Sequence, residues 1–437
     1  MTETGEIFAP AFKEQPYWWD EGAPTALASI DLPRHVDAAV VGTGITGLNA
    51  AIVLARAGRS VLVLDSGDAC EGASSRNAGY VGRTLKHSFT KLVKRDGQER
   101  AVAVYQGLQE AFAAVAEIIS TEQIRCDFKI CGRLILAPSQ RHYDDLAAEL
   151  GVRKKLLGQN FEMVPARSLR AEIQSDLYVG GAAIPDLGAL HPGLYAKGLL
   201  GVAARAGALI ATRTPVVAIT ASGTPQTFTV TTPRGSVLAR NVLVATNGYT
   251  STVTPWLLRR VIPFDAYMIA TEPLSRGRAE SLLPGDRTFL DANHNINFVR
   301  RFHDGRLLFG GRTGSRAPSL KAMAARLHGE LLRILPGAQG ARLTHAWTGR
   351  CAATFDLNPH IGVHEGVHYA MGYCFAGVPM GTYLGQKAAR KIMGGRSAAT
   401  AFDDLAFPTV PLYSGNPWFV PLAMAGYDWL DRRHAGH

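Results

Sequence analysis

The chain has 437 residues, of which 47% are apolar and 19% are charged, as is typical of a globular protein. This length exceeds the size at which a single hydrophobic core usually stops growing, so we expect two domains. The formal net charge of +10 favours anionic ligands. Because the basic residues are scattered rather than gathered into a stripe, the charge gives no support to a nucleic-acid-binding protein.

The five cysteines form neither a CxxC pair nor a metal-finger spacing, so we predict no disulfide framework and no structural metal site. Residues 1–30 lack the basic start and apolar run of a secretory signal, and no stretch of about 18 apolar residues occurs. We therefore expect a soluble cytoplasmic protein without a transmembrane segment. The oligomeric state cannot be derived from these patterns.

Residues 37–65, DAAVVGTGITGLNAAIVLARAGRSVLVLD, predict a strand, a glycine-rich turn, a helix and a second strand. Gly42, Gly44 and Gly47 form GxGxxG at the junction of strand and helix, where glycines permit a tight turn and a close backbone approach to a pyrophosphate. Asp65 ends the second strand, where an acid accepts hydrogen bonds from ribose hydroxyls. The order of these parts predicts a dinucleotide-binding unit.

The next segment distinguishes the dinucleotides that this unit could bind. An acid at position 65 argues against the 2′-phosphate of NADP, which leaves NAD and FAD. An NAD domain usually continues with another helix and strand, whereas residues 66–82 form a polar, glycine-rich loop with Arg76 and Asn77 at its centre. Such a loop could lie along a pyrophosphate and reach a flavin ring, so the sequence favours FAD.

GASSRNAGYVG, residues 72–82, resembles the GASGRNGG segment of the D-amino-acid-oxidase-like FAD-dependent oxidoreductases, the superfamily of glycine and sarcosine oxidases. Further segments resemble that family in the same order: YWWDEGAP at 17–24, LHPGLYAKGLL at 190–200, NVLVATNGYTS at 241–251 and GYCFAGVPMG at 372–381. Within the family, the chain is most similar to the members that oxidise γ-glutamylputrescine.

The resemblance implies a Rossmann-like α/β domain for FAD, interleaved with a mixed, largely antiparallel α+β substrate domain, as in the glutathione-reductase-2-type flavoproteins. We expect the FAD domain at 30–98, 188–250 and 342–405, and the substrate domain at 99–187 and 251–341. Residues 1–29 would form an N-terminal arm and residues 406–437 a C-terminal tail or helix. The periodicity of residues 107–120 independently predicts a helix, and residues 286–312 read as strands separated by turns.

The resemblance also implies which residues hold the cofactor. Those on the pyrophosphate, ribose, adenine and flavin sides would be Gly42, Gly44, Ile45, Thr46, Gly47, Asp65, Ser66, Ser74, Ser75, Arg76, Asn77, Ala78, Val216, Ala245 and Gly248. A final helix would turn its N-terminal amides toward the flavin through Gly372, Gly377, Val378, Met380 and Gly381. Pro379 would fit the first position of that helix.

Two departures from the family pattern bear on the substrate. Amino-acid-oxidising relatives tend to have an arginine where this chain has Cys351, and a guanidinium is the natural clamp for an α-carboxylate. Cys351 also falls near the position where some relatives bond the flavin covalently, so a covalent link and a buried structural thiol are both considered. The second departure is in GYCFAGVPMG, where Phe375 and Ala376 replace a glycine–histidine pair.

Substrate contacts are expected from Tyr267, Asn297, Arg300, Arg312 and Phe375, with Arg300 as the candidate for a distal anion. The resemblance implies oxidation of a small secondary or N-substituted amine, γ-glutamylputrescine-like, by hydride transfer to flavin N5 and hydrolysis of the imine. No catalytic base is predicted. Oxygen and another acceptor such as a quinone both remain open for flavin reoxidation.

Three other functions are compatible with parts of the sequence. A flavin enzyme that oxidises a modified RNA base would suit the positive charge but lacks a basic stripe. A non-catalytic FAD-binding subunit would share every cofactor motif. An NAD dehydrogenase would leave residues 66–82 and 372–381 unexplained.

The aromatic segment NPWFVPLAMAGYDWLDRR, residues 416–433, has two interpretations. It suits a terminal helix docked on the protein's own surface, and its basic end also suits an interfacial membrane helix.

Overall fold

The computed structural model describes residues 7–223, 227–403 and 405–434. Residues 1–6 of the predicted N-terminal arm and residues 404 and 435–437 near the C-terminus lie outside the described residues, as do residues 224–226. Within the described chain, no helix is both long and apolar enough to cross a membrane.

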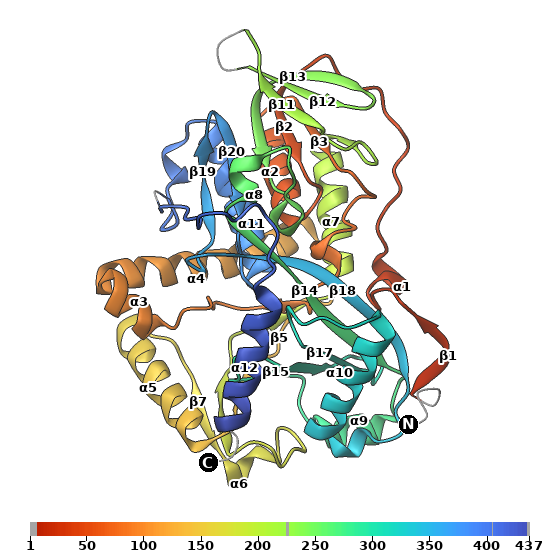
Figure 1. Ribbon diagram of the computed structural model, residues 1–437, viewed down its shortest axis with the longest axis vertical. Helices are drawn as coiled ribbons and strands as arrows, with labels where there is room; N and C mark the ends of the chain where they lie inside the picture. Colours follow the sequence, from red (N-terminus) through yellow and green to blue (C-terminus); the bar gives the residue numbers. More distant parts are fainter. Residues whose placement is uncertain (1–6, 224–226, 404, 435–437) are drawn as a thin grey trace.

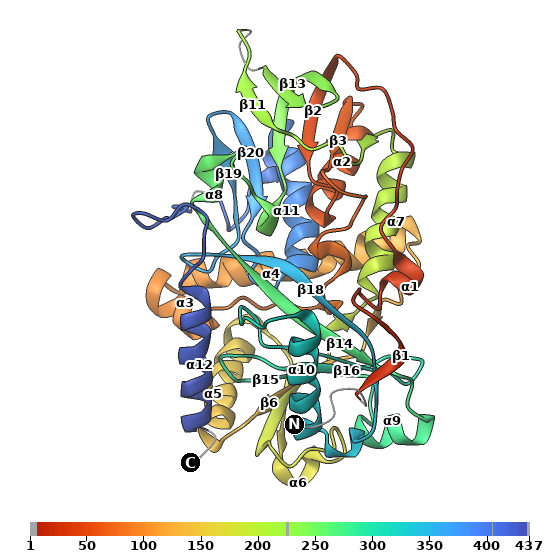
Figure 2. The same ribbon diagram turned by 45° about the vertical axis from the view of Figure 1, so that its right-hand side comes forward.

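An eight-stranded sheet forms the upper part of the molecule in Figures 1 and 2. Its strands, in spatial order, are β10 (Leu209–Ala211), β3 (Val61–Leu64), β2 (His35–Val41), β13 (Gly235–Val244), β12 (Phe228–Thr232) and β11 (Ala218–Ala221). In addition, β20 (Val367–Met371) pairs with β13, and β19 (His360–His364) pairs with β20. The pairs from β10 to β13 are parallel, and β3 reads VLVL because both of its faces are buried.

One face of this sheet packs against helices, and the helix and strand side chains share one continuous core. The helices of this layer are α2 (Ile45–Arg56), α4 (Gln98–Glu122), α7 (Pro192–Arg205) and α11 (Gly377–Ile392). The helix predicted at 107–120 lies inside α4 and is confirmed. A parallel sheet with a helix after its first strand is the arrangement that positions a nucleotide at the strand ends.

A nine-stranded mixed sheet forms the lower part of the molecule. Its order is β1 (Phe8–Lys13), β18 (Leu343–Thr354), β14 (Val261–Thr271), β17 (Leu307–Gly311), β16 (Phe298–Arg301), β15 (Thr288–Asp291), β6 (Arg133–Ala137), β8 (Gly180–Ile184) and β7 (Glu162–Pro165). The three strands β15, β16 and β17 confirm the strands predicted within 286–312. Helices α9 (Arg276–Leu282) and α10 (Leu320–Ile334) contribute to the core on one of its faces.

Shorter elements connect these layers. A small sheet joins β4 (Tyr80–Val81), β9 (Gly188–Ala189) and β5 (Lys129–Ile130). The remaining helices are α1 (Trp19–Gly22), α3 (Phe89–Asp96), α5 (Gln140–Leu157), α6 (Ala166–Leu169), α8 (Pro255–Leu258) and α12 (Val420–His434), and the short 3₁₀ turns are Ala73–Ser75, Asn247–Tyr249, Pro336–Ala338 and Arg396–Ala398. The predicted fold class is confirmed, whereas the domain boundaries stay a prediction.

Strands β14 and β18 form a long antiparallel pair that reaches from the lower sheet toward the upper one (Figures 1 and 2). Phe264 stands directly opposite Cys351, and residues two apart on a strand share a face. A Cβ on Gly349 would lie 3.1 Å from Cβ of Arg76. The face that carries Phe264 and Cys351 therefore looks toward the loop of residues 66–82.

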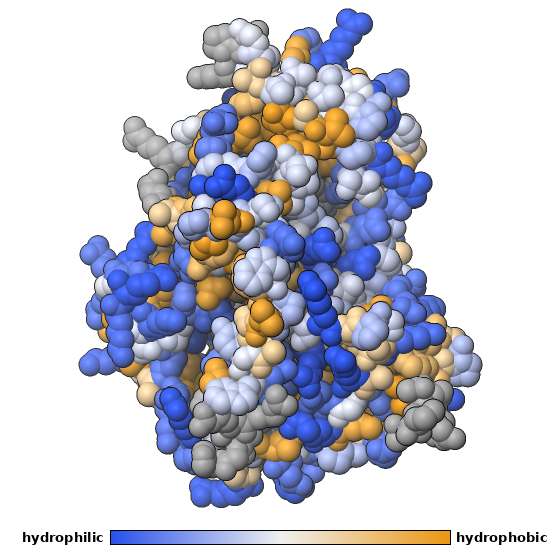
Figure 3. Space-filling view, in the orientation of Figure 1, coloured by the Kyte–Doolittle hydropathy of each residue, from blue (hydrophilic) through white to orange (hydrophobic). Residues whose placement is uncertain are grey.

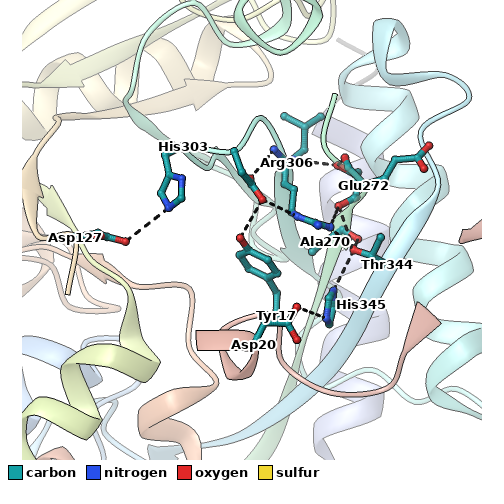
Figure 4. Close-up of polar contacts among 12 residues, drawn as sticks. Tyr17, Asp20, Asp127, Ala270, Glu272, His303, Arg306, Thr344 and His345 are labelled. Carbon is teal, nitrogen blue, oxygen red and sulfur yellow. Dashed lines mark hydrogen bonds and ion pairs between the residues drawn. The ribbon is translucent and has the colours of Figure 1, made fainter. Parts of the chain in front are cut away.

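The N-terminal arm is tied to the lower sheet by a network of polar side chains (Figure 4). The Tyr17 hydroxyl donates to Asp304 over 3.1 Å, and Arg306 Nε donates to the same carboxylate over 2.8 Å. On the other side of the arm, Nε2 of His345 lies 3.2 Å from Oδ2 of Asp20. These contacts attach the arm to the turn between β16 and β17 and to β18 before the chain enters β2.

The adjacent tryptophans attach the same arm to the loop of residues 66–82. Trp18 is fully buried, and its Nε1 donates to the Asn77 carbonyl over 2.8 Å. Trp19 Nε1 donates to Ser75 Oγ over 3.0 Å. The arm thus holds the loop and the lower sheet in one fixed arrangement.

The terminal helix α12 lies on the protein's own surface. Asp428 accepts hydrogen bonds from Arg312 and Asn295, and Asp431 accepts from the His294 backbone. Figure 3 shows pale and orange side chains along the strip where Figure 1 draws α12, and Leu422 there is 68% exposed. These direct contacts support the interpretation of residues 416–433 as a helix docked on the protein's own surface.

Replacing Trp18 with alanine is expected to lower the free energy of unfolding by about 3–5 kcal/mol, the usual effect of removing a buried aromatic ring. Trp18→Phe retains most of the ring and loses the hydrogen bond to Asn77, so a loss of about 1–2 kcal/mol is expected. Chemical denaturation of the purified variants measures both values. Equal stability of wild type and W18A would show that the arm does not hold the loop.

Candidate functional site

The glycines of the GTGITG turn allow backbone to approach backbone where β2 meets α2. Gly42 has φ +110°, and a Cβ there would lie 3.0 Å from the Ala245 carbonyl oxygen. A Cβ on Gly47 would lie 2.0 Å from the Gly42 carbonyl oxygen, which no real side chain tolerates. The turn therefore closes tightly on the first turn of α2, whose amides lack intrahelical partners and form a positive end.

Asp65 fixes this turn from the end of β3. Its Oδ2 accepts hydrogen bonds from the backbone amide and the hydroxyl of Thr43, over 2.7 and 2.5 Å. Its backbone carbonyl accepts from the Thr214 amide over 2.7 Å, which brings the segment leading to Val216 beside it. Asp65 therefore lies at the predicted ribose position and also orders the turn. Its neighbour Ser66 is exposed.

The loop of residues 66–82 is ordered by its own side chains. Ser74 Oγ accepts a hydrogen bond from the Ile45 amide at the start of α2 over 3.0 Å. The Asn77 side chain donates to the Ser74 carbonyl over 2.9 Å and accepts from the Gly79 amide over 2.8 Å. The loop thus folds back over the glycine turn, with Ala78 next to Asn77.

Arg76 joins this loop to the lower sheet. Its Nε donates to the Glu71 carbonyl over 2.8 Å and its Nη1 to the Thr348 carbonyl over 3.2 Å. Its guanidinium lies 4.3 Å from the ring centre of Trp19, and its own carbonyl accepts from Trp347 Nε1 over 2.8 Å. Arg76 acts in this structure as a bridge between segments.

The segment after β13 approaches the same edge of β18. A Cβ on Gly248 would lie 2.5 Å from the Cys351 carbonyl oxygen, so only glycine fits there. The side-chain oxygen of Asn247 accepts from the Gly372 amide over 2.9 Å. Ala245 is buried. The strand end, β18 and the loop before α11 therefore meet at one place.

Helix α11 begins at Gly377, two residues earlier than the sequence predicted. Pro379 occupies its third position rather than its first, where its missing N–H still falls among the four unpaired donors of a helix start. The Met380 amide donates to the Ala376 carbonyl over 3.0 Å. The amides of Gly377 and Val378 remain at the positive end of the helix.

The starts of α2 and α11 lie against each other. A Cβ on Gly381 would lie 3.1 Å from Thr46 Oγ1, and one on Gly385 would lie 2.3 Å from the Thr46 carbonyl oxygen. Thr46 Oγ1 is also hydrogen-bonded to the Tyr373 hydroxyl over 2.8 Å. Two helix N-termini therefore converge, which is a favourable setting for an anionic ligand such as a pyrophosphate.

The structure thus brings together most of the residues predicted to bind the cofactor. The glycine turn, the loop of residues 66–82, the end of β13 and the start of α11 surround the exposed edge of β18. This arrangement fits a dinucleotide that carries a flavin. It offers glycine backbone that a ligand can approach closely, the N-termini of α2 and α11, and the carboxylate of Asp65 after β3. Their individual contacts with FAD stay predictions.

Phe264 on β14 and Cys351 on β18 face the loops predicted to bind the cofactor, and the surface that they form is called the wall below. Burial raises the pKa of the Cys351 thiol to about 12, with smaller contributions from Cys374 and Asp265. The ring of Phe264 lies 5.4 Å from that of Phe375, which is 53% exposed. This wall offers apolar surface and neutral sulfur.

The two arginines predicted on the substrate side, Arg300 and Arg312, and the nearby Arg350 all have other partners. Arg312 forms ion pairs with Glu330 and Asp428, the latter over 2.9 Å. Arg350, the neighbour of Cys351, lies 3.5 Å from Asp265 on the opposite strand. Arg300 is buried and donates to the carbonyls of Ala78 and Leu190. Of the three, only Arg300 reaches the loop of residues 66–82.

The two polar candidates also make structural contacts. The Tyr267 hydroxyl donates to the Ser315 carbonyl over 3.2 Å, on the opposite face of β14 from Phe264. Asn297 donates through its side chain to Asp291 over 3.0 Å. Burial raises the pKa of Asp291 to about 6, although the hydrogen bonds from Asn297 act in the opposite direction. These contacts place both residues in the framework around the site.

Sequence reasoning missed Thr43 and Phe264. Thr43 is the variable residue between two glycines, so the motif alone gives no reason to select it, although its contact with Asp65 orders the turn. Phe264 could have been found from strand alternation once Cys351 was known to stand opposite it. That register requires the structure.

Comparison with known proteins agrees with this geometry. The family model described as "FAD dependent oxidoreductase" matches residues 37–391. The chain is 30% identical over 401 residues to the gamma-glutamylputrescine oxidoreductase of Escherichia coli, covering 91% of this chain and 92% of that protein. It is 30% identical over 384 residues to the probable oxidoreductase OrdL of Haemophilus influenzae, covering 86% and 87% of the two chains.

Solved structures show the same fold. The glycine oxidase of Geobacillus kaustophilus superposes with a TM-score of 0.73 at 21% identity, covering 87% of this chain and 99% of that one. The L-proline dehydrogenase of P. horikoshii gives 0.70 at 17% identity, covering 90% and 99%.

Fold and site together define a flavoprotein with a Rossmann-like cofactor domain. The chain belongs to the D-amino-acid-oxidase-like family of FAD-dependent oxidoreductases. The predicted cofactor, FAD, and the oxidoreductase class are confirmed by this membership.

Gly47→Ala is expected to abolish FAD binding, because its Cβ would overlap a backbone oxygen that cannot move without opening the turn. Gly151→Ala in α5 is the matched control, since a Cβ there meets nothing within 4 Å and alanine favours a helix. The measurement is the flavin content of each purified variant. Normal flavin content in G47A would contradict the proposed position of the pyrophosphate.

Acid precipitation is expected to release the flavin into the supernatant and leave a colourless pellet. A thiol with a pKa of about 12 is almost wholly protonated near neutral pH, and thiolate is the reactive form. Cys351→Ser should leave the release unchanged. A yellow pellet from wild type that turns colourless in C351S would establish a covalent link.

Proposed function

We propose that this enzyme oxidises a small secondary or N-substituted amine whose reacting carbon has no adjacent carboxylate and which bears an anionic group farther away, as γ-glutamylputrescine does. The observation that carries this proposal is the wall at β14 and β18. Phe264 and Cys351 stand opposite each other on the face toward the cofactor loops. An apolar wall suits a methylene chain, whereas an α-carboxylate needs a cation.

The ion pairs that the neighbouring arginines form support the same conclusion. Arg350 and Arg312 are paired with acids, so neither is available as a clamp without breaking an ion pair. The similarity to gamma-glutamylputrescine oxidoreductase over nine-tenths of both chains also favours an amine of this type.

FAD, when bound, supplies an acceptor for the hydride of the amine carbon. The chain's own residues orient the substrate and exclude water. The positive start of α11, at Gly377 and Val378, would stabilise negative charge on the cofactor side. Phe264 and Phe375 would shield the reacting carbon, and the neutral Cys351 thiol adds no charge beside it. No side chain is assigned as a base, because a neutral amine needs none for hydride loss.

The electron acceptor is oxygen or a quinone, and the location is expected to be the cytoplasm. All five cysteines are free thiols, as suits a reducing compartment.

The proposal is tested by mixing the oxidised enzyme with amines in the absence of air and following bleaching of the flavin. γ-Glutamylputrescine is expected to bleach it at least about tenfold faster than glycine or sarcosine, a difference of about 1.4 kcal/mol in transition-state binding. Faster bleaching by an α-amino acid would overturn the amine assignment. No bleaching by any amine would favour a non-catalytic subunit, and bleaching only by modified tRNA would favour the RNA enzyme.

Phe264→Ala should reduce the bleaching rate by about tenfold without altering flavin content, because a gap in the wall misplaces the substrate. Val363→Ala is the control, since Val363 is 51% exposed on β19. Equal bleaching rates in F264A and wild type would show that Phe264 does not position the substrate.

A further inference from the structure

Two buried arginines in the lower sheet form no ion pair with any acid that the structure describes. Arg133 and Arg300 are each only 4% exposed. Arg133 Nε donates to Thr288 Oγ1 over 3.1 Å, while its Nη2 is buried without any hydrogen-bond partner among the described residues. Arg300 Nη1 donates only to main-chain carbonyls, those of Leu190 over 3.0 Å and Ala78 over 3.3 Å. Both guanidinium groups are therefore charged and uncompensated.

Arg83, another buried arginine, does have a counter-charge. It forms an ion pair with Asp186 and also donates to Gln109. Arg153 instead donates both Nε and Nη2 to the neutral side-chain oxygen of Gln159, so neither of these donors is left unpaired. Burying a charge without a counter-charge costs several kcal/mol, so a fold that buries two together requires compensation.

The two groups lie in one row across three strands. Arg133 on β6 is opposite Thr288 on β15. Phe289 on β15 is opposite Val299 on β16, and continuing that register by one residue places Thr288 opposite Arg300. Residues directly opposite on neighbouring strands share a face of the sheet, so Arg133, Thr288 and Arg300 form a polar row on one face.

Tyr80 lies over this row. Its hydroxyl donates to the carbonyls of Phe289 and Val299, over 3.1 and 2.9 Å. The guanidinium of Arg133 lies 4.8 Å from the centre of its ring. Burial lowers the pKa of both arginines, which means that their charged form is disfavoured by loss of solvation. Burial raises the pKa of the Tyr80 phenol, which therefore stays neutral. Tyr80 therefore brings no negative charge to the row.

The two acids that act on Arg300 from a distance, Asp286 and Asp127, already have closer basic partners. Asp286 binds Lys129 over 2.8 Å and Arg301 over 3.3 Å. Asp127 lies 4.0 Å from His303, as Figure 4 shows. Both act on Arg300 only at longer range.

The loop of residues 66–82 closes the row from above. A Cβ on Gly79 would lie 3.0 Å from Nη1 of Arg300, and one on Gly82 would lie 2.7 Å from Nη1 of Arg133. Glycine at both positions lets the backbone of the cofactor loop rest on the guanidinium groups. An ion held here would be within the reach of that loop.

We propose that Arg133, Thr288 and Arg300 form a buried binding site for a monovalent anion, a halide ion or a carboxylate group, beneath the loop of residues 66–82. Nη2 of Arg133 and the donors of Arg300 would bind the anion, and Thr288 would align the first guanidinium. The anion would neutralise the row and steady Gly79 and Gly82. The site does not depend on the nature of the oxidised amine.

The first test is the thermal stability of the FAD-bound enzyme in chloride, bromide and acetate, with ionic strength held constant by a bulky sulfonate such as the anion of HEPES, which is neither a halide nor a carboxylate. A ligand that binds only the folded state should raise Tm by about 1.5 °C for each tenfold increase above its dissociation constant. Arg133→Met and Arg300→Met should flatten this dependence. Arg240→Met is the control, because Arg240 is 73% exposed in its ion pair with Asp37.

Wild type whose Tm is independent of the small anion would overturn the proposal. If a methionine variant does not fold, anomalous diffraction from bromide-soaked crystals of the wild-type holoenzyme decides: a peak between the two guanidinium groups supports the site, and its absence there overturns it.

The source of the anion is found by competition. If a substrate carboxylate occupies the site, chloride should raise the KM of γ-glutamylputrescine and leave that of N-acetylputrescine, which has no carboxylate, unchanged. If the site holds a free ion, chloride should stabilise the enzyme without affecting either KM. Both outcomes support an anion site, and neither depends on γ-glutamylputrescine being the preferred substrate.

Discussion

The structure depends on close contact between backbones at positions where glycine omits a Cβ. Gly47 against Gly42, Gly248 against Cys351 and Gly385 against Thr46 all bring main-chain atoms nearer than any side chain would allow. These contacts draw the turn before α2, the end of β13 and the start of α11 to one edge of β18. The resulting surface consists of amides and carbonyls, which is what recognition of a pyrophosphate and a flavin ring requires.

Strand β18 couples this surface to the substrate side. It pairs with β14 along its whole length and with β1 at its start, while the carbonyls of Thr348 and Ala352 accept hydrogen bonds from Arg76 and Cys374 of the upper part. A change in the register of β14 and β18 would therefore move Phe264 and Cys351 relative to the cofactor loops. The N-terminal arm limits such movement, because Trp18 packs against Trp347 of β18 and each ring donates a hydrogen bond to the loop of residues 66–82.

Much of the cofactor side could be predicted from sequence because its information is local. GxGxxG, the acid at the end of the next strand and the loop of residues 66–82 all lie within residues 42–82, and their spacing follows from strand and helix geometry. The substrate side could not be predicted in the same way. Arg312 is paired with Asp428, which lies 116 positions away, and Arg300 is buried under a loop that precedes it by more than two hundred. Neither partner has a sequence signal.

The central claim is that these convergent backbone segments hold one FAD per chain in the orientation that exposes its ring to the wall of Phe264 and Cys351. The measurement that tests it most directly is a crystal structure of the FAD-loaded enzyme. The account predicts the pyrophosphate between the starts of α2 and α11 and the ring against β18. A folded protein that takes up no FAD, or one whose flavin ring lies away from β18, would contradict it.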